Sequence, residues 1–140
     1  MKKKGLCLVC GSIIIILGLV SAAWSHMVFG IYFQPSGLNI TKPGVYECDV
    51  TVDPLYAKVG FVLQADQASL PDNVHVMIMP PVGFFKYAND PPKTLKMTII
   101  AGPKAQQGSR NISLTLTQII PPYDKDVHII NGPYLNISFQ

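Results

Sequence analysis

Residues 45–52 read Val-Tyr-Glu-Cys-Asp-Val-Thr-Val, so polar and apolar side chains alternate along this stretch. Successive side chains of a β-strand point to opposite faces of the sheet, which would make one face of this strand apolar and the other polar. The apolar face would carry Tyr46, Cys48, Val50 and Val52. The stretch is typical of a strand with one buried face, and Cys48 is predicted to be a buried structural thiol.

The same alternation recurs through the rest of the chain, with turn residues between the segments. The predicted inward positions are Val59, Phe61, Leu63 and Ala65; Val74, Val76 and Ile78; Leu95, Met97 and Ile99; Ile112, Leu114 and Leu116; and Leu135, Ile137 and Phe139. Asn131-Gly132 is predicted to form a hairpin turn before the last strand. All 12 prolines follow position 33, which excludes long helices there. The sequence predicts one all-β, antiparallel sandwich of about seven strands.

A basic and then apolar segment precedes this region. Three lysines at positions 2–4 are followed by residues 5–33, an apolar run broken only by three serines and one histidine. A membrane-spanning helix needs roughly 20 apolar residues, and lysines before it favour a cytoplasmic N-terminus. We therefore expect a cytoplasmic segment of residues 1–4, a single-pass signal-anchor helix of residues 5–33 in the cell membrane, and an extracytoplasmic domain of residues 34–140.

Two further features of the apolar run bear on its role. Small residues would fall on one side of the helix and would allow another helix to pack closely in lipid. This predicted helix-packing stripe consists of Gly11, Gly18, Ala22 and Ser25, with Cys7 beside it. Alternatively, Ala23-Trp24-Ser25 is a signal-peptidase site, and cleavage there would leave His26 as the mature N-terminus.

Charge excludes one class of partner. The net charge is +3 and comes from the lysines at positions 2–4, because eight basic and eight acidic residues balance in the rest of the chain. No basic patch for nucleic acid is present, so none is expected as a partner. The expected partners are the lipid bilayer and other membrane or envelope subunits.

Three sequons suggest glycosylation of the outer domain. They are Asn39-Ile40-Thr41, Asn111-Ile112-Ser113 and Asn136-Ile137-Ser138, and none has proline in its middle position. Strand alternation places Asn111 and Asn136 on outward-facing positions. Three sequons in so short a domain favour an extracytoplasmic location.

The sequence shows no arrangement of a nucleophile and a base, so a domain without catalysis is expected. Two sets of residues nevertheless suggest metal ligands. His75, Met77 and Met79 would share one face of a strand, and imidazole with thioether is a ligand set that selects copper, above all Cu(I). The second set is Asp124, Asp126 and His128. The alternative is that these side chains pack against the protein or cap a turn, which leaves the domain without a cofactor.

An aromatic cluster lies between two proline pairs. Phe84, Phe85 and Tyr87 would form a partner contact if they are exposed, since an exposed apolar patch marks a contact with protein or membrane. The alternative is that Phe84 or Phe85 closes one end of the sandwich.

Several turn motifs resemble those of a known class of domain. Residues 41–46 read Thr-Lys-Pro-Gly-Val-Tyr, a strand-opening motif of immunoglobulin-like (Ig-like) domains. The motifs that follow it are at residues 79–84, 94–99, 105–108 and 111–116. Over residues 38–139 their order resembles the Ig-like domains of prokaryotic surface proteins and glycosidases, although Ser109-Arg110 replaces a frequent tyrosine. The resemblance implies an Ig-like fold and an extracellular location, and it implies no reaction.

The expected function is that of a membrane-anchored accessory or structural subunit of a membrane or cell-envelope complex. Two alternatives stay open. Archaeal pilins and archaellum stator proteins also join an N-terminal apolar helix to an Ig-like sandwich, and Lys4-Gly5 before the apolar run resembles their processing site. The second alternative is a copper-binding accessory protein that uses the histidine and methionines of residues 75–79.

Overall fold

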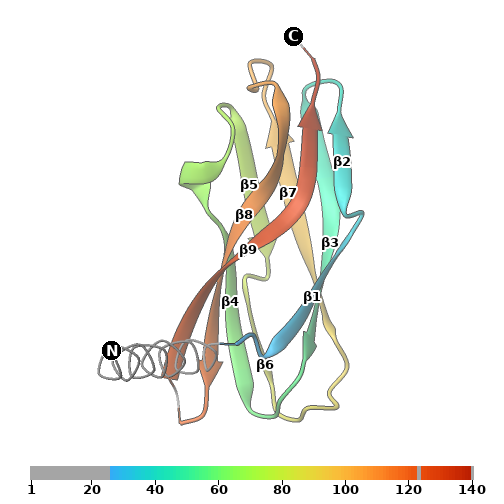
Figure 1. Ribbon diagram of the computed structural model, residues 1–140. Coiled ribbons are helices and arrows are strands. Elements are labelled where there is room, and N and C mark those ends of the chain that lie inside the picture. Colours follow the sequence, from blue (N-terminus) through green and yellow to red (C-terminus); the bar gives the residue numbers. More distant parts are fainter. Residues whose placement is uncertain (1–25, 123, 140) are drawn as a thin grey trace, which may run out of the picture.

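A computed structural model describes residues 26–122 and 124–139, and β-strands joined by turns and short loops make up most of this part of the chain (Figure 1). The strands are β1 (Phe29–Gln34), β2 (Gly37–Ile40), β3 (Gly44–Pro54), β4 (Val59–Ala65), β5 (Val74–Met79), β6 (Val82–Phe85), β7 (Lys93–Ala101), β8 (Gly108–Ile120) and β9 (Asp124–Ile137). One turn of 3-10 helix, η1 (Gln67–Ser69), follows β4. The predicted all-β class is confirmed.

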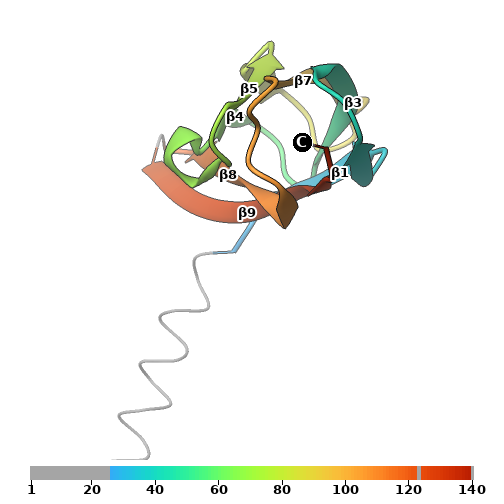
Figure 2. The same cartoon turned by 90° about the horizontal axis from the view of Figure 1, so that it is seen from above.

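The strands form two layers. Sheet A has the strand order β1-β3-β7-β5, and sheet B has the order β2-β9-β8-β4-β6. Seen from above, β3, β5 and β7 lie along one side of the molecule and β8 and β9 along the other (Figure 2). The predicted sandwich is therefore confirmed.

The sandwich differs from the prediction in two details. It has nine strands in the described residues, and the pairing of β2 with β9 is parallel, whereas the other pairs are antiparallel. The physical reason lies in the first part of the domain. This part pairs with β3 in sheet A through β1 and then crosses to sheet B as β2, where it runs in the same direction as the C-terminal strand.

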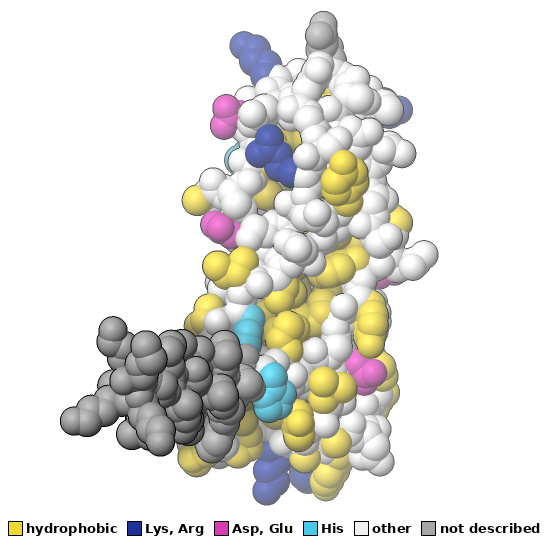
Figure 3. Space-filling model, viewed as in Figure 1, with side chains coloured by type: hydrophobic (Ala, Val, Ile, Leu, Met, Phe, Trp, Pro, Cys, Tyr) yellow, Lys and Arg dark blue, Asp and Glu magenta, His cyan; other side chains and the backbone are white. Residues whose placement is uncertain are grey.

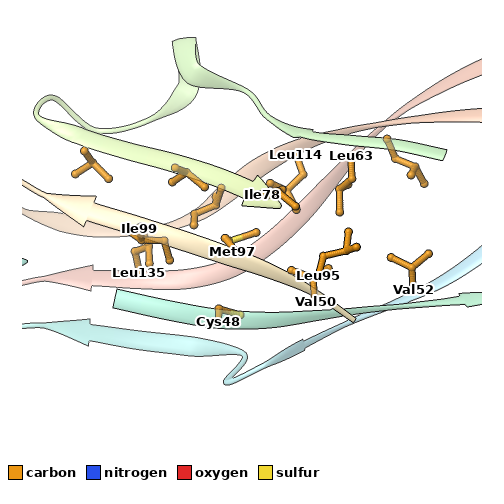
Figure 4. Close-up of a cluster of buried hydrophobic side chains, with 14 of the residues drawn as sticks. Cys48, Val50, Val52, Leu63, Ile78, Leu95, Met97, Ile99, Leu114 and Leu135 are labelled. Atoms are coloured by element: carbon orange, nitrogen blue, oxygen red, sulfur yellow. The ribbon is translucent and has the colours of Figure 1, made fainter. Parts of the chain in front are cut away.

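The inward positions that the alternation predicted form the core. Side chains from both sheets, among them Cys48, Leu63, Met97, Leu114 and Leu135, meet between the layers (Figure 4). Cys48 is buried as predicted, and its thiol donates to the carbonyl oxygen of Pro35 at 3.2 Å. Burial raises the pKa of this thiol above its ordinary value, because the thiolate loses solvation there.

The predicted boundary of the apolar helix is wrong at its C-terminal end. Residues 29–33 form most of strand β1, and Val28 and Phe29 are buried in the domain core. The helix was predicted to extend over residues 29–33 because a buried strand and a membrane helix can both be continuously apolar. Residues 5–25, with the predicted packing stripe Gly11, Gly18, Ala22 and Ser25, lie outside the described residues. Within residues 26–122 and 124–139, no helix has the length and apolar character needed to cross a membrane.

The predicted hairpin turn at Asn131-Gly132 is also wrong. Strand β9 runs through these residues and pairs with β8 on both sides of them. The register shifts there, because Asn111 faces Tyr134 while Ser113 faces Asn131, which leaves one extra residue on β9. A Cβ atom on Gly132 would lie 3.0 Å from the carbonyl oxygen of Ile112, so this glycine serves a close approach of backbones inside a bulge.

Candidate docking surface

The outer face of sheet A carries a charged cluster at its centre, and its exposed large hydrophobic side chains, Tyr32, Val45, Met77 and Met79, lie around this cluster. Glu47 and Asp49 of β3 face outward, and Lys96 of β7 lies beside them. The Lys96 Nζ atom is 2.8 Å from Asp49 Oδ1 and 3.6 Å from Glu47 Oε2. The hydrogen bond to Asp49 raises the pKa of the Lys96 ammonium group above its usual value. This face has the charged pairs expected of a solvated sheet surface.

The outer face of sheet B is apolar over half of its length. Cross-strand register places Val127, Thr117, Val62 and Val82 in one row across β9, β8, β4 and β6. The next row toward the β8–β9 turn contains Lys125, Ile119, Gly60 and Phe84. Apart from Lys125 at one end, neither row contains a charge.

We call this surface the sheet-B patch. Its members are Val62, Val82, Phe84, Ile119, Val127 and Ile129. Ile129 is 77% exposed, Val127 59% and Phe84 57%. Hydrophobic side chains gather over the lower half of the face that carries β8 and β9, and they are sparser above it (Figure 3). A contiguous apolar patch of this kind is a candidate interaction surface.

Gly60 shapes the centre of the sheet-B patch. It has no side chain, so the Phe84 ring lies close above it, and a Cβ atom there would be 3.4 Å from Phe84 Cδ2. A shallow apolar hollow of about 420 Å³ forms around this point, between Val62, Phe84 and Ile119. The hollow can accept a bulky apolar side chain of a partner.

The predicted aromatic cluster is divided between the surface and the core. Phe84 and Tyr87 are exposed, as a partner contact requires, and Phe84 belongs to the sheet-B patch. Phe85 is buried and packs against Phe61 and Phe29, with ring centroids 6.1 and 5.9 Å away. The prediction of Phe85 as a contact residue is wrong, because adjacent residues of a strand point to opposite faces.

The residues predicted to bind copper are accessible. His75, Met77 and Met79 lie on the exposed positions of β5, which is an edge strand of sheet A. Among the described residues, no group of three or more His, Cys, Asp or Glu side chains is arranged to hold a metal ion. In the second predicted set, Asp126 and His128 form a pair with Oδ2 and Nε2 2.8 Å apart, and Asp124 is exposed at the start of β9.

Two of the three predicted glycosylation sites are neighbours in sheet B. Asn39 of β2 faces Asn136 of β9, and the Asn136 Nδ2 atom donates to Asn39 Oδ1 at 3.3 Å. Asn136 also accepts a hydrogen bond from Ser109 Oγ at 2.9 Å. Asn111 is exposed on β8, and its amide donates to the carbonyl oxygen of Gly132 at 3.0 Å. A glycan on Asn136 would have to displace its neighbours, whereas Asn39 and Asn111 are more open.

Sequence reasoning missed a polar clamp that holds the start of the domain. Gln118 of β8 is fully buried; its Oε1 accepts from the Val28 amide at 2.6 Å, and its Nε2 donates to the His26 carbonyl oxygen at 3.2 Å. The signal in the sequence was a glutamine on the inward phase of an otherwise apolar strand. Most of the sheet-B patch was missed as well, although Val127 and Ile129 alternate with His128 in a recognisable way.

Comparisons with known proteins give structural likenesses at low identity. No protein-family model matches the chain, and no curated protein does. The crystal structure of domains 4 and 5 of the S-layer protein SbsC is similar at a TM-score of 0.43 and 11% identity, over 79% of this chain and 52% of that one.

Two further structures are similar to the same extent. The S-layer protein rSbsC(31-844) has a TM-score of 0.42 and 12% identity, over 79% of this chain and 13% of that one. The BIgI domain of the beta protein from S. agalactiae, in a structure bound to CEACAM1, has a TM-score of 0.45 and 12% identity, over 80% of this chain and 98% of that one. This chain therefore spans about half or less of the S-layer chains. Likenesses of this size assign neither a family nor a partner.

Proposed function

We propose that this chain is a membrane-anchored, extracytoplasmic Ig-like protein that acts without catalysis as an accessory or structural subunit of a membrane or cell-envelope complex. The apolar run before residue 26 would anchor the chain, and the sandwich would cover the outer surface of a partner protein. The proposal rests mainly on one observation, which is the contiguous apolar patch that cross-strand register assembles on the outer face of sheet B. This patch has a central hollow, whereas the ion pairs of Lys96 with Asp49 and Glu47 interrupt the apolar residues on the outer face of sheet A.

The energetics favour a protein partner for the sheet-B patch. Burial of apolar surface yields about 25 cal/mol per Å², and a sheet face of four strands can exclude water from its centre when another flat surface covers it. The patch occupies neighbouring strands whose register is fixed by the ladder, so its shape is set before a partner arrives. Such preorganisation lowers the entropy cost of association.

A matched pair of substitutions tests the proposal. Val127→Asp places a carboxylate in the sheet-B patch, and Val45→Asp makes the same change at a similarly exposed valine on the outer face of sheet A. The tagged full chain is extracted from native membranes in mild detergent, and co-purified proteins are identified by mass spectrometry. Burying an unpaired carboxylate costs several kcal/mol, so Val127→Asp should reduce recovery of the partner by at least ~10-fold.

The outcome of the Val45→Asp control decides the interpretation. This variant should retain the partner at the level of the unmodified chain. Equal recovery with Val127→Asp and Val45→Asp would contradict a role for sheet B in docking. N-terminal sequencing of the same preparation separates the alternatives: a start at Met1 agrees with a retained anchor, a start at Leu6 with a pilin-like filament subunit, and a start at His26 with a secreted domain.

Copper binding stands as a second candidate, because His75, Met77 and Met79 all lie exposed on one edge strand. Alternate residues of a strand are roughly 6.6 Å apart along its axis, and the two flexible thioether side chains can bend toward the imidazole. Titration of the full chain with Cu(I), in competition with a chromogenic chelator, tests this role. Loss of affinity in Met77→Leu and Met79→Leu would support it, and the absence of any competition would exclude it.

A further inference from the structure

One end of the sandwich is distinguished by the way the chain enters it. We call this end the base; it contains the start of β1, the β3–β4 and β8–β9 turns and the loop before β7, and it lies opposite the C-terminus (Figure 1). Val28 is buried there, and its carbonyl oxygen accepts a hydrogen bond from the Leu55 backbone amide at 2.9 Å. The backbone N–H of Val28 donates to the side-chain Oε1 atom of Gln118. Phe29 follows and packs edge-on against Phe61, with ring centroids 5.5 Å apart.

These contacts begin directly after the undescribed residues 5–25 of the apolar run. Only His26 and Met27 lie between Ser25, at the end of the run, and the buried Val28. The three steps from Ser25 to Val28 span at most ~11 Å even when fully extended. A bilayer that holds the apolar run up to Ser25 would therefore lie next to the base.

The surface of the base exposes apolar and tyrosine side chains, which are the residue types found where proteins contact a membrane interface. Leu55 and Tyr56 of the β3–β4 turn are 54% and 51% exposed, and Tyr87 of the next loop is exposed as well. An apolar hollow of about 440 Å³ lies between Tyr56, Ile120 and the start of the described chain at His26. Tyrosine is enriched where proteins meet lipid headgroups, because its ring is apolar and its hydroxyl group is polar.

The opposite end of the sandwich provides the contrast. Its turns comprise residues 41–44, 66–73 and 102–107, and none of the exposed large hydrophobic side chains of the described residues lies in them. They carry polar groups such as Lys42, Asp72 and Lys104 instead. The apolar turns are thus confined to the end that receives the apolar run.

Charge indicates which lipids the base would accept. The charged residues of the strand ends and turns at the base are Lys58, Lys86, Lys93 and Lys125 and, in equal number, Asp53, Asp90, Asp124 and Asp126. A base without net charge gains nothing from anionic lipid over zwitterionic lipid. Contact through Leu55 and the tyrosines would depend on apolar burial in the headgroup layer.

We infer that the base of the sandwich rests on the bilayer, with Leu55 and Tyr56 in the headgroup region and the Gln118 clamp fixing the domain upright above its anchor. This inference rests on the proposed function, since it requires that the apolar run stays attached and spans the membrane. It adds an orientation in which the sheet-B patch faces sideways, toward a neighbour in the same membrane.

Fluorescence quenching by labelled lipid tests the inference on the full chain. Cys7 and Cys10 are changed to alanine, Cys48 stays buried and unlabelled, and a bimane label is attached at Leu55→Cys or at the control Val45→Cys. Leu55 and Val45 are ten positions apart at opposite ends of one extended segment, roughly 33 Å at 3.3 Å per residue. The labelled proteins are reconstituted in phosphatidylcholine vesicles, with or without a lipid that carries a nitroxide quencher on its headgroup.

The expected result is a several-fold loss of fluorescence at position 55 and no loss at position 45. Equal quenching at the two positions, in protein that floats with the vesicles after a carbonate wash, would overturn the inference and leave the anchor intact. Protein that fails to float would overturn both the inference and the proposed anchoring. Repeating the measurement with phosphatidylserine vesicles should give the same quenching, and a requirement for anionic lipid would contradict the apolar mode of contact.

Discussion

Gln118→Met removes the clamp at the base of the domain while nearly preserving side-chain length. The glutamine is fully buried and holds both the Val28 amide, at 2.6 Å, and the His26 carbonyl oxygen, at 3.2 Å. Methionine fits a similar space but offers neither the acceptor nor the donor that these two backbone groups use. The substitution therefore tests whether the junction between the apolar run and the sandwich is held by this one side chain.

The cost follows from the burial of the two groups. The Val28 amide is buried, so leaving it without its acceptor costs about 1–3 kcal/mol, whereas the exposed His26 carbonyl can bind water and loses about 0.5–1 kcal/mol. We expect the free energy of unfolding to fall by about 2–3 kcal/mol. With a urea dependence of about 1–3 kcal/mol per M, the midpoint should fall by about 0.7–3 M.

Urea titration of the full chain in detergent micelles, with Cys7 and Cys10 changed to alanine, provides the assay. Unfolding exposes Cys48, so a brief pulse of a thiol reagent reports the unfolded fraction at each urea concentration. The matched control is Gln64→Met, which makes the same change at an exposed position of β4 and should shift stability by less than about 0.5 kcal/mol. Equal midpoints for Gln118→Met and the unmodified chain would refute the reasoning.

Three further predictions concern other parts of the domain. Gly83→Ala should lower the free energy of unfolding by about 1–3 kcal/mol in the same urea assay, because the new Cβ atom would overlap the buried Phe61 ring. An unchanged urea midpoint would show that the Phe61 ring can shift to make room for the new methyl group. Cys48 should resist thiol reagents at neutral pH in the folded chain, and rapid labelling of native protein would contradict this. The free energy of unfolding should fall as the pH rises above the ordinary thiol pKa of 9.0. The reason is that burial raises the pKa of the folded-state thiol, so the thiol of the unfolded chain ionises first. In a host that glycosylates sequons, Asn39 and Asn136 should never both carry glycans on one molecule, since they face each other across adjacent strands, and intact-mass peaks for three occupied sequons would be evidence against it.

The strands and their buried faces followed from the sequence because period-2 alternation is a local signal. Each predicted inward set lies in the core, from Val50 in sheet A to Leu114 in sheet B. The predictions were wrong where one local sequence pattern is compatible with two different structures. Residues 29–33 are apolar enough for a membrane helix or a buried strand, and Asn131-Gly132 suits a hairpin turn as well as a bulge.

Most of the sheet-B patch could not be predicted from the sequence, because its residues come from four different strands. Val62, Val82 and Val127 are distant in the chain, and only the register of four strands brings them into one row. An outward valine also looks like an inward one until the phase of the strand is known. The proline-bounded segment left open whether Phe84 or Phe85 is buried, and only the strand phase shows that Phe85 is buried and Phe84 exposed.

Site-specific photocrosslinking from Ile129 tests directly whether the apolar face of sheet B docks on a partner protein. A benzophenone amino acid replaces Ile129, the most exposed apolar residue of the sheet-B patch, or Val45 on sheet A as the control, and native membranes are irradiated. A discrete protein adduct is expected from position 129 and none from position 45. No adduct from position 129, or equal adducts from both positions, would contradict docking through this face.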